Sequence, residues 1–320
     1  MATIRDLAKK PELFTGGHRL CAGCGAGIIA RQVLMAANTP VVVANATGCL
    51  EVSSTIFPYS AWKTSWFHSA FENAAASCSG IEATYRSLKR QGKINKDIRF
   101  IAFGGDGGTY DIGLQSLSGA MERGHRMLYV CYDNGAYMNT GIQRSSATPI
   151  GAYTTTAPTG KEKKGKEQQR KDLTEIMVAH SIPYVAQSAV GFWSDLVNKV
   201  QKALDTDGPT FINVLQPCRL GWGHAPETIT DIGKLAADTC FWPLYEVVDG
   251  TYRVTYKPKE KKPVTEFLKT QVRFKHLMSP DSQDVVAKMQ NEIDRKWNRL
   301  QKLHADGIAA AAAVPAGDAK

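Results

Sequence analysis

Two short apolar runs, with a helical segment between them, constrain the fold of this chain most. Residues 99–103 (Arg-Phe-Ile-Ala-Phe) and 127–132 (Met-Leu-Tyr-Val-Cys-Tyr) have the length and composition of buried strands. Residues 112–123 have helical spacing, and Gly124 is a common stop signal. A strand, a helix and a second strand in this order predict a right-handed βαβ unit. We therefore expect an α/β fold with a parallel sheet flanked by helices.

Each predicted strand is followed by a residue that can ligate a cation through oxygen. Asp106 lies in Gly104-Gly-Asp-Gly-Gly108, and Asn134 lies 28 positions later. The carboxyl ends of neighbouring parallel strands meet at one edge of a sheet, so both side chains are expected there. Mg²⁺ takes few protein ligands and shares phosphate oxygens, while glycines let the backbone approach phosphates closely. The pattern predicts a magnesium-bound diphosphate.

Other phosphate-binding patterns fit less well. No G-x-G-x-x-G opens a helix at this turn, which disfavours a dinucleotide, and no P-loop motif occurs in the sequence. A Gly-Asp-Gly turn by itself is common. The strand context and the Asn-containing second turn are what favour a cofactor site over an ordinary turn.

Seven cysteines give an independent constraint. Cys21 and Cys24 form a C-x-x-C pair, and Cys49 and Cys218 each follow an apolar, strand-like run. Four thiolates gathered from such turns suit a [4Fe–4S] cluster. A structural Cys₄ zinc site and a thiol redox pair remain open on this spacing. A disulfide framework is disfavoured, because the count is odd, the chain is large and no secretory signal precedes it.

These motifs resemble those of one known family. The Gly-Asp-Gly turn followed by Asn134 is similar to the thiamine diphosphate signature, and residues 106–113 and 134–141 resemble the thiamine-diphosphate-dependent 2-oxoacid:ferredoxin oxidoreductases. The likeness covers roughly residues 15–278. It is strongest to the β subunits of pyruvate-specific members, at residues 46–51, 57–62, 71–75, 173–180, 241–245 and 274–277. The fold implied is the diphosphate-type thiamine fold with a C-terminal extension.

The resemblance also implies ligands for two metal centres. Cys21, Cys24, Cys49 and Cys218 match the four positions that hold a [4Fe–4S] cluster in the family. Cys78, Cys131 and Cys240 have no match, and we expect the first two to be buried apolar fillers. For Mg²⁺ the implied ligands are the side-chain oxygens of Asp106 and Asn134 and the carbonyl of Ala136.

Further residues are implied to contact the cofactor and the substrate. Gly105, Gly107 and Gly108 admit the diphosphate of thiamine diphosphate. Cys49 and Tyr137 line the thiazolium side. Asn139 matches a position close to the substrate and is the candidate catalytic residue that orients it, although asparagine is also favoured in turns. His68 and Glu72 are expected in a helix with structural roles.

The activity implied is oxidative decarboxylation of pyruvate with coenzyme A to acetyl-CoA and CO₂, with electrons passed through the [4Fe–4S] cluster to ferredoxin. A pyrimidine-binding domain and a two-cluster ferredoxin motif are both missing from the sequence. The resemblance therefore implies α (pyrimidine-domain), γ and ferredoxin-like δ subunits, or a fused equivalent. This chain alone should be inactive.

Three alternatives stay open. The first is the same chemistry on a different 2-oxoacid: oxalate, a branched-chain 2-oxoacid or 2-oxoglutarate. The second is a non-oxidative thiamine enzyme, which needs no cluster. The third is an electron-carrying iron–sulfur module, which needs no Gly-Asp-Gly turn. The physiological direction and the stoichiometry of the complex do not follow from the sequence.

Composition excludes some classes of protein. The net charge of +9 raises the question of nucleic acid, but the basic runs at 161–171 and 257–262 carry no aromatic stacking platform. They are interpreted as solvated loops or as surfaces that attract acidic ferredoxin or coenzyme A phosphates; the role of residues 161–171 is not fixed by sequence. No run approaches 18 apolar residues, which argues against a membrane span, and a reducing cytoplasm is the default.

The chain is expected to divide into four parts. Residues 1–17 form an N-terminal arm, 18–220 the thiamine diphosphate and [4Fe–4S] domain, and 221–308 a C-terminal extension. The extension contains a hairpin at 245–256 and a charged helix at 284–302. Residues 309–320 are rich in alanine, proline and glycine and are expected to be disordered.

Overall fold

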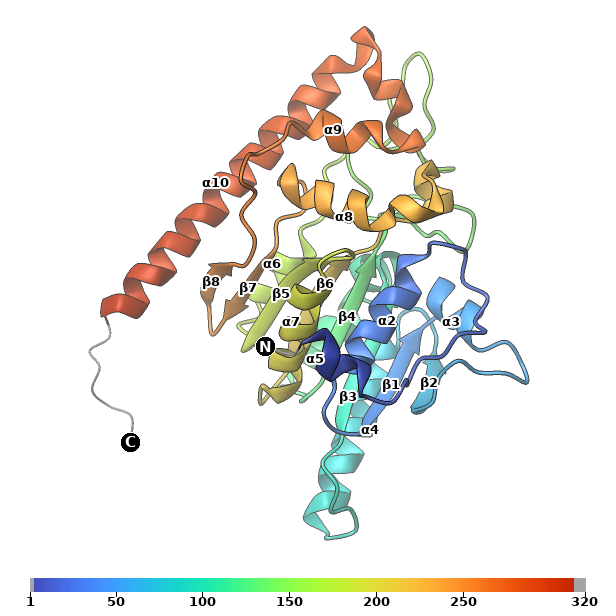
Figure 1. The fold of residues 1–320 in the computed structure, drawn as a ribbon, viewed down its shortest axis with the longest axis vertical. Helices are drawn as coiled ribbons and strands as arrows, with labels where there is room; N and C mark the ends of the chain where they lie inside the picture. Colours follow the sequence, from blue (N-terminus) through green and yellow to red (C-terminus); the bar gives the residue numbers. More distant parts are fainter. Residues whose placement is uncertain (1–2, 314–320) are drawn as a thin grey trace.

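A single mixed sheet of eight strands lies at the centre of the computed structural model, which describes residues 3–313 (Figure 1). The strand order is β2-β1-β3-β4-β6-β5-β7-β8. The first six strands pair in parallel: β1 (Val41–Ala46), β2 (Ser65–Ser69), β3 (Arg99–Gly105), β4 (Leu128–Asp133), β5 (Tyr184–Ala189) and β6 (Thr210–Leu215). β7 (Tyr245–Val248) and β8 (Thr251–Val254) are antiparallel. The predicted α/β fold is confirmed.

The predicted βαβ unit is present with one local difference. β3 and β4 are parallel neighbours and include the expected runs 99–103 and 127–132. The connecting helix begins later than predicted: a π-helical turn occupies Gly107–Asp111, and α5 spans Leu114–Glu122. Such wide turns are frequent at functional sites. Gly124, with φ +70°, follows the end of the helix as the stop signal predicted.

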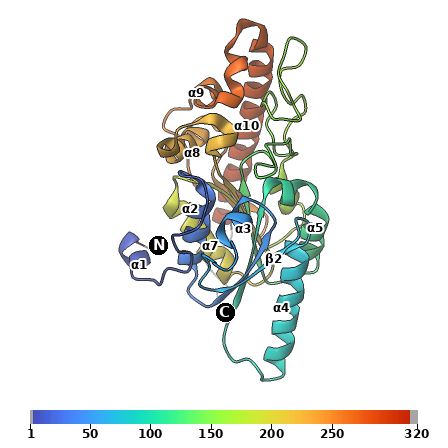
Figure 2. The same cartoon turned by 90° about the vertical axis from the view of Figure 1, so that its right-hand side faces the viewer.

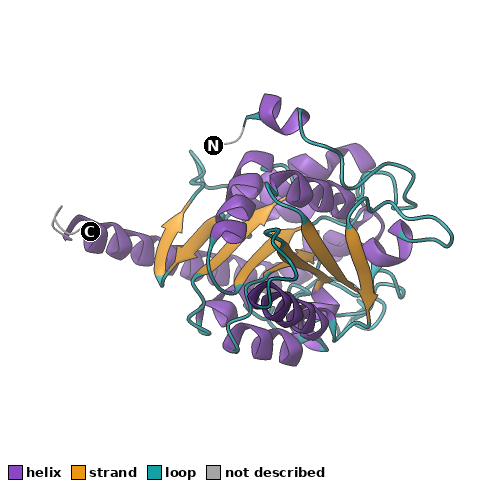
Figure 3. Cartoon of the chain, turned by 90° about the horizontal axis from the view of Figure 1, so that it is seen from below, coloured by secondary structure: helices purple, strands orange, loops and turns teal. Residues whose placement is uncertain are grey.

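Helices cover both faces of the sheet (Figures 2 and 3). One face carries α2 (Gly25–Ala36) and α7 (Trp193–Asp205), and the other carries α4 (Ala74–Arg90) and α5. Along β3, Ile101 and Phe103 pack into the core on the α2 and α7 side, whereas Phe100 and Ala102 pack into the core on the α4 and α5 side. This alternation follows from the two-residue period of a strand. The parallel sheet is thus buried on both sides, as its apolar runs require.

The remaining elements gather mainly around the carboxyl edge of the sheet. They are α1 (Ile4–Ala8), α3 (Cys49–Ser54), α6 (Leu173–Val178), α8 (Ile229–Asp238), α9 (Val264–Lys269) and α10 (Gln283–Ala313), with short turns at Arg219–Gly223, Pro226–Thr228, Val272–Met278 and Pro280–Ser282. α8, α9 and the start of α10 lie above this edge, and α10 then runs down past β8 (Figure 1). None of the helices within residues 3–313 has the length and apolar content needed to cross a bilayer.

The expected parts of the chain share one sheet. The hairpin expected at 245–256 is present as β7 and β8, and β7 pairs with β5, so the C-terminal segment extends the central sheet. The boundaries at 17, 220 and 308 stay predictions. Residues 309–313, expected to be disordered, instead continue α10, because alanine is the strongest helix former. Residues 314–320 lie outside the described part.

The prediction that His68 and Glu72 lie in a helix is also wrong. His68 lies in the edge strand β2, paired with β1, and Glu72 lies in the turn before α4. The run 65–69 mixes exposed and half-buried residues and has no fully buried one, as is common in a strand at the edge of a sheet. His68 Nε2 lies 2.7 Å from Thr47 Oγ1, beside Cys49.

Candidate functional site

The carboxyl edge of β3 and β4 brings the three predicted Mg²⁺ ligands together. The Asn134 N–H donates to Asp106 Oδ1 at 3.3 Å. The Asn134 side-chain oxygen faces Asp106 Oδ1 and the Ala136 carbonyl, and the atom in that position lies 2.9 Å from each. All three residues are at least nine-tenths buried. We call the three oxygens of Asp106, Asn134 and Ala136 the oxygen site.

The spacing of the oxygen site fits a small divalent cation. Mg²⁺ binds oxygen at about 2.1 Å in octahedral geometry, so neighbouring ligands lie about 2.9 Å apart. Without a cation, three acceptors at this spacing repel one another. Burial and the neighbouring Asp133 carboxylate raise the pKa of Asp106 well above its usual value. A bound cation would reverse that effect, because positive charge stabilises the carboxylate.

A small cavity beside the oxygen site is lined by the predicted cofactor residues. Its lining includes Cys49, Gly105, Asp106, Gly107, Gly108, Asn134, Ala136, Tyr137 and Asn139. The cavity volume is about 30 Å³, close to that of one water molecule. The Tyr137 ring covers Gly107, with its hydroxyl donating to the Gly107 carbonyl at 3.1 Å. A Cβ at Gly107 would lie 2.2 Å from Tyr137 Cε1, so this position depends on glycine.

Sequence reasoning missed two residues that contact this site. Ser145 Oγ donates to Asp106 Oδ2 at 2.5 Å from a loop 39 positions away. Tyr132, inside the predicted strand, lines the cavity, and within the described residues its buried hydroxyl has no hydrogen-bond partner. A Cβ at Gly48 would lie 2.8 Å from that hydroxyl. An unpaired hydroxyl beside a cofactor pocket indicates a ligand contact.

The four predicted cluster cysteines come from four separate positions around the same edge. Cys24 caps α2, Cys49 begins α3 and Cys218 caps the turn Arg219–Gly223, whereas Cys21 lies in the exposed loop before α2. Burial, and then the charges of the other cysteines, raise the pKa of Cys24 to about 11 and that of Cys49 to about 12. The four thiols are therefore within electrostatic reach of one another.

The surroundings of these thiols suit bound iron–sulfur better than free thiolates. The Gly221 N–H donates to Cys218 Sγ at 3.4 Å, and a Gln216 side-chain N–H approaches Cys24 Sγ at 3.8 Å. Hydrogen bonds to sulfur are a feature of such clusters. Within residues 3–313 no three His, Cys, Asp or Glu side chains already form a metal-binding group. A cluster would therefore have to draw the thiols closer together.

The other three cysteines lie apart from this group. Cys78 is 1% exposed in α4, Cys131 is fully buried in β4, and Cys240 is 3% exposed. Burial agrees with the expectation that Cys78 and Cys131 are apolar fillers. All seven cysteines are free in the structure.

A buried ion pair lies directly behind the oxygen site. Arg170 donates to Asp133 Oδ2 at 2.6 Å and to the Tyr110 hydroxyl at 2.9 Å, and that hydroxyl donates to Asp133 Oδ2 at 2.5 Å. Asn213 donates to the same Tyr110 oxygen at 2.7 Å. We call Asp133, Arg170, Tyr110 and Asn213 the Arg170 network. No local sequence pattern indicates this network, because its members are 23 to 103 positions apart.

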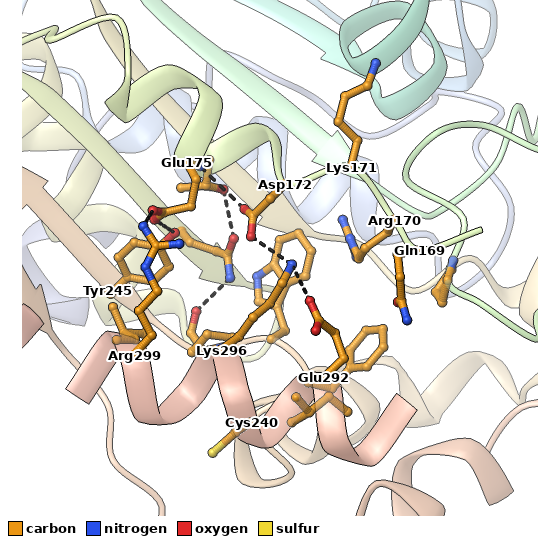
Figure 4. A pocket seen from close by; sticks show the side chains of 18 of the residues that line it. Gln169, Arg170, Lys171, Asp172, Glu175, Cys240, Tyr245, Glu292, Lys296 and Arg299 are labelled. Atoms are coloured by element: carbon orange, nitrogen blue, oxygen red, sulfur yellow. Dashed lines mark hydrogen bonds and ion pairs between the residues drawn. The ribbon is translucent and has the colours of Figure 1, made fainter. Parts of the chain in front are cut away.

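Arg170 and Tyr110 of the network also line a pocket that lies under α10 (Figure 4). Its volume is about 120 Å³. Its charged groups pair with one another: Lys296 with Asp172 at 2.9 Å and Arg299 with Glu175 at 3.4 Å. Charges that are already paired offer little to a charged ligand, so this pocket is a weaker candidate than the oxygen site.

Comparison with known proteins gives one consistent result. The model of the thiamine pyrophosphate enzyme, C-terminal TPP binding domain, matches residues 46–214. The chain is 54% identical over 293 residues to pyruvate synthase subunit PorB of Methanocaldococcus jannaschii, covering 91% of this chain and 97% of that protein. It is 52% identical over 305 residues to the Thermotoga maritima PorB, covering 93% and 94%.

Two further similarities are weaker. The ketoisovalerate oxidoreductase subunit VorB of Pyrococcus abyssi is 42% identical over 294 residues, with 91% of this chain and 93% of that protein covered. The solved 2-oxoglutarate:ferredoxin oxidoreductase of Magnetococcus marinus aligns with a TM-score of 0.52 at 20% identity, covering 66% of this chain and 65% of that one. At this identity the structural match supports the fold alone.

Proposed function

Because this chain belongs to the family of pyruvate synthase PorB subunits, which are thiamine-dependent 2-oxoacid:ferredoxin oxidoreductase subunits, we propose that it holds the metal–diphosphate half of a pyruvate-oxidising centre and its first [4Fe–4S] cluster. The observation that carries the proposal is the oxygen site at the carboxyl edge of the sheet, with four thiols around the same edge. The net reaction is pyruvate, coenzyme A and two oxidised ferredoxins giving acetyl-CoA, CO₂, two reduced ferredoxins and one proton, which comes from the coenzyme A thiol.

Asp106, Asn134 and Ala136 are the proposed protein ligands of Mg²⁺. The Asn134 oxygen lies 2.9 Å from Asp106 Oδ1 and from the Ala136 carbonyl, a spacing that suits neighbouring ligands of a small cation, which would also take diphosphate oxygens. When bound, thiamine diphosphate supplies a nucleophilic carbon and an electron sink. The task of the protein's own residues at this edge is to hold the cation that neutralises the diphosphate and to orient the cofactor.

Gly105, Gly107 and Gly108 are the proposed approach for the diphosphate. The Tyr137 ring lies over Gly107, with its hydroxyl donating to the Gly107 carbonyl at 3.1 Å. Tyr137 and Cys49 line the thiazolium side, and Asn139, in the same lining, orients the substrate.

Cys21, Cys24, Cys49 and Cys218 are the proposed cluster ligands. Burial disfavours the thiolate forms of Cys24, Cys49 and Cys218. The positive charge of an iron centre would offset this desolvation cost, which the protein alone does not offset. The N–H groups directed at Cys218 and Cys24 would tune the potential of a reducible cluster.

Pyruvate is the proposed substrate, because the relatives above 50% identity carry the name pyruvate synthase, while the ketoisovalerate relative is 42% identical. A complex with α (pyrimidine-domain), γ and ferredoxin-like δ subunits, or a fused equivalent, is proposed, with ferredoxin as acceptor. Exposed aromatic side chains support a subunit contact: Phe57 and Tyr59 are 94% and 75% exposed on one loop next to α3.

The test is electron paramagnetic resonance on the complex purified anaerobically through a tag on this chain, before and after adding pyruvate with coenzyme A. We expect a substrate-derived radical, then a reduced [4Fe–4S] signal. The same complex is treated with 2-oxoisovalerate and 2-oxoglutarate as controls. A cluster reduced by dithionite but silent to pyruvate would exclude pyruvate as substrate. Zinc in place of iron would exclude the electron-transfer role.

A further inference from the structure

Gln216 occupies the point where the oxygen site and the cysteine group meet. It follows β6 and precedes Pro217 and Cys218 in the chain. Its side chain is buried, with 2% exposure. Its backbone N–H donates to the Asp133 carbonyl at 2.7 Å, which fixes it beside the turn that carries Asn134.

Both ends of the Gln216 amide have partners of fixed character. Its Oε1 accepts from Asn134 Nδ2 at 2.9 Å. Its Nε2 donates to the Pro217 carbonyl at 3.0 Å and approaches Cys24 Sγ at 3.8 Å. A carbonyl oxygen accepts only, so Pro217 sets which end of the Gln216 amide is the nitrogen. Gln216 Oε1 is thereby left facing Asn134.

This contact fixes the orientation of the Asn134 amide in turn. With Nδ2 directed at Gln216 Oε1, the Asn134 oxygen faces Asp106 and Ala136. The opposite orientation would let Asn134 donate to those two oxygens at 2.9 Å each, but would set its own oxygen 2.9 Å from Gln216 Oε1. Two buried acceptors at that distance are unfavourable. Gln216 therefore favours the Asn134 orientation in which the side-chain oxygen can bind a cation. It disfavours the orientation in which the side-chain nitrogen donates to Asp106 and Ala136.

We propose that Gln216 is a positioning residue that directs the Asn134 oxygen at the metal and, through its other end, hydrogen-bonds the Cys24 sulfur of the cluster. The inference rests on the proposed function for the identity of the two metal centres. One buried amide then links the group that holds the diphosphate to a ligand of its electron acceptor. Partners of this kind commonly set ligand orientation in metal sites.

The packing around Gln216 supports this fixed role. A Cβ at Gly25 would lie 2.9 Å from Gln216 Cγ and 3.0 Å from Ile229 Cδ1. Glycine at the start of α2 therefore leaves the room that the Gln216 side chain fills. Because Gly25 directly follows Cys24, the same close approach brings the sulfur within reach of Gln216 Nε2.

The two functions can be separated by two substitutions. Gln216→Met has similar length and removes both the acceptor for Asn134 and the donor to Cys24. Gln216→Glu keeps an acceptor oxygen for Asn134 Nδ2 but removes the donor and places negative charge near the sulfur. Gln187→Met is the matched control: Gln187 is also a buried glutamine, here within β5, and is bonded to Thr174 and the Pro243 carbonyl and not to the proposed ligands.

Two measurements on the purified complex test the proposal. Affinity for Mn²⁺, used in place of Mg²⁺ with thiamine diphosphate present, is read from the signal of free Mn²⁺. The midpoint potential of the cluster comes from a redox titration followed by electron paramagnetic resonance. For Gln216→Met we expect about 10- to 100-fold weaker Mn²⁺ binding and a lower potential. For Gln216→Glu we expect Mn²⁺ binding closer to wild type and again a lower potential. The control should change neither.

Specific outcomes would overturn the proposal. Mn²⁺ affinity of the Gln216→Met complex equal to that of the control would remove the orienting role. A cluster potential unchanged in both Gln216 variants would remove the link to Cys24. A wild-type complex that binds neither Mn²⁺ nor iron would instead overturn the proposed function, and the inference with it. The wild-type measurement thus separates the two failures.

Discussion

The oxygen site and the Arg170 network are adjacent buried polar regions, and they satisfy their charges in opposite ways. Asp133 and Asn134 are consecutive residues, yet the Asp133 carboxylate receives Arg170 and Tyr110, whereas the Asn134 oxygen faces only other oxygens. Both regions are at least nine-tenths buried apart from Arg170, which is partly shielded. In the Arg170 network the Asp133 carboxylate has its partners without a ligand, and within the described residues Asn213 Oδ1 is the network atom left without one. In the oxygen site the Asn134 oxygen faces two other oxygens and lacks a donor.

The difference shows how a binding site is recognised in a protein without its ligand. A buried ion pair with all of its hydrogen bonds made is a structural element, because removing one partner is costly. Acceptors that converge without a donor are costly as they stand and need a reason to persist. The reason that we propose at this edge is a cation, with the neighbouring glycines facing the anion that such a cation would carry.

The largest expected effect is at the oxygen site. Asp106→Ala removes the one charged ligand, so turnover with pyruvate should fall below detection while the visible absorption of the cluster persists. Asp231→Ala, a substitution of an exposed carboxylate, is the control. Turnover and cluster absorption are measured on the same anaerobic preparation. Substantial turnover by Asp106→Ala would show that the oxygen site does not hold the metal.

The cysteines provide the second test, in which burial and ligation make different predictions. Cys218→Ser should lose most of the cluster iron, because a ligand is removed, whereas Cys78→Ser should keep it. Cys78 is the more buried of the two. Iron and acid-labile sulfide per complex are the measurements. Equal iron loss in the two variants would contradict the choice of ligands.

The Arg170 network should respond in stability and not in metal binding. Arg170→Met leaves Asp133 buried without its cation, and we expect the free energy of unfolding to fall by about 3–5 kcal/mol. Lys296→Met breaks an ion pair whose side chains are over a third exposed and should cost about 1 kcal/mol or less. Denaturant unfolding measures both. A larger loss from Lys296→Met would reverse the assignment of the two pairs.

The last expected effect, which changes affinity without changing the protein, is the pH dependence of metal binding. Burial and Asp133 raise the pKa of Asp106, so protons compete with the cation over a higher pH range than for an ordinary aspartate. Below that pKa the Mn²⁺ affinity should rise about tenfold per pH unit, and above it the affinity should level off. Titrations between pH 5 and 8, about the range in which folded proteins are most stable, measure this. Affinity independent of pH would mean that Asp106 is ionised throughout.

The sequence predicted those parts of the site that follow strand ends. Asp106 and Asn134 could be placed because a buried run precedes each of them, and the parallel pairing of β3 and β4 then brings them together. Ser145, Gln216 and Arg170 could not, because their contacts with these turns span 39, 82 and 37 positions and depend on loop paths. Tyr132 could not be recognised either, because it lies inside a predicted strand, where an aromatic residue indicates packing in the core.

The errors in the predicted elements have local causes. The predicted helix began two residues early, at Ile112, because the helical spacing continues N-terminally of α5 into Ile112 and Gly113, which link the π-helical turn to α5. His68 was assigned to a helix because an edge strand with mixed burial has no continuous apolar run. The alanine-rich end of α10 was judged by composition as flexible, although alanine favours helix when a helix already precedes it.

The central claim is that Asp106, Asn134 and Ala136 hold the cation that carries the diphosphate of the cofactor. The most direct test is electron–nuclear double resonance on the Mn²⁺-loaded complex with thiamine diphosphate bound. The account predicts ³¹P couplings of directly coordinated phosphate at the Mn²⁺ signal, and their loss in Asp106→Ala. A wild-type Mn²⁺ signal without ³¹P coupling, or a coupling that survives Asp106→Ala, would contradict it.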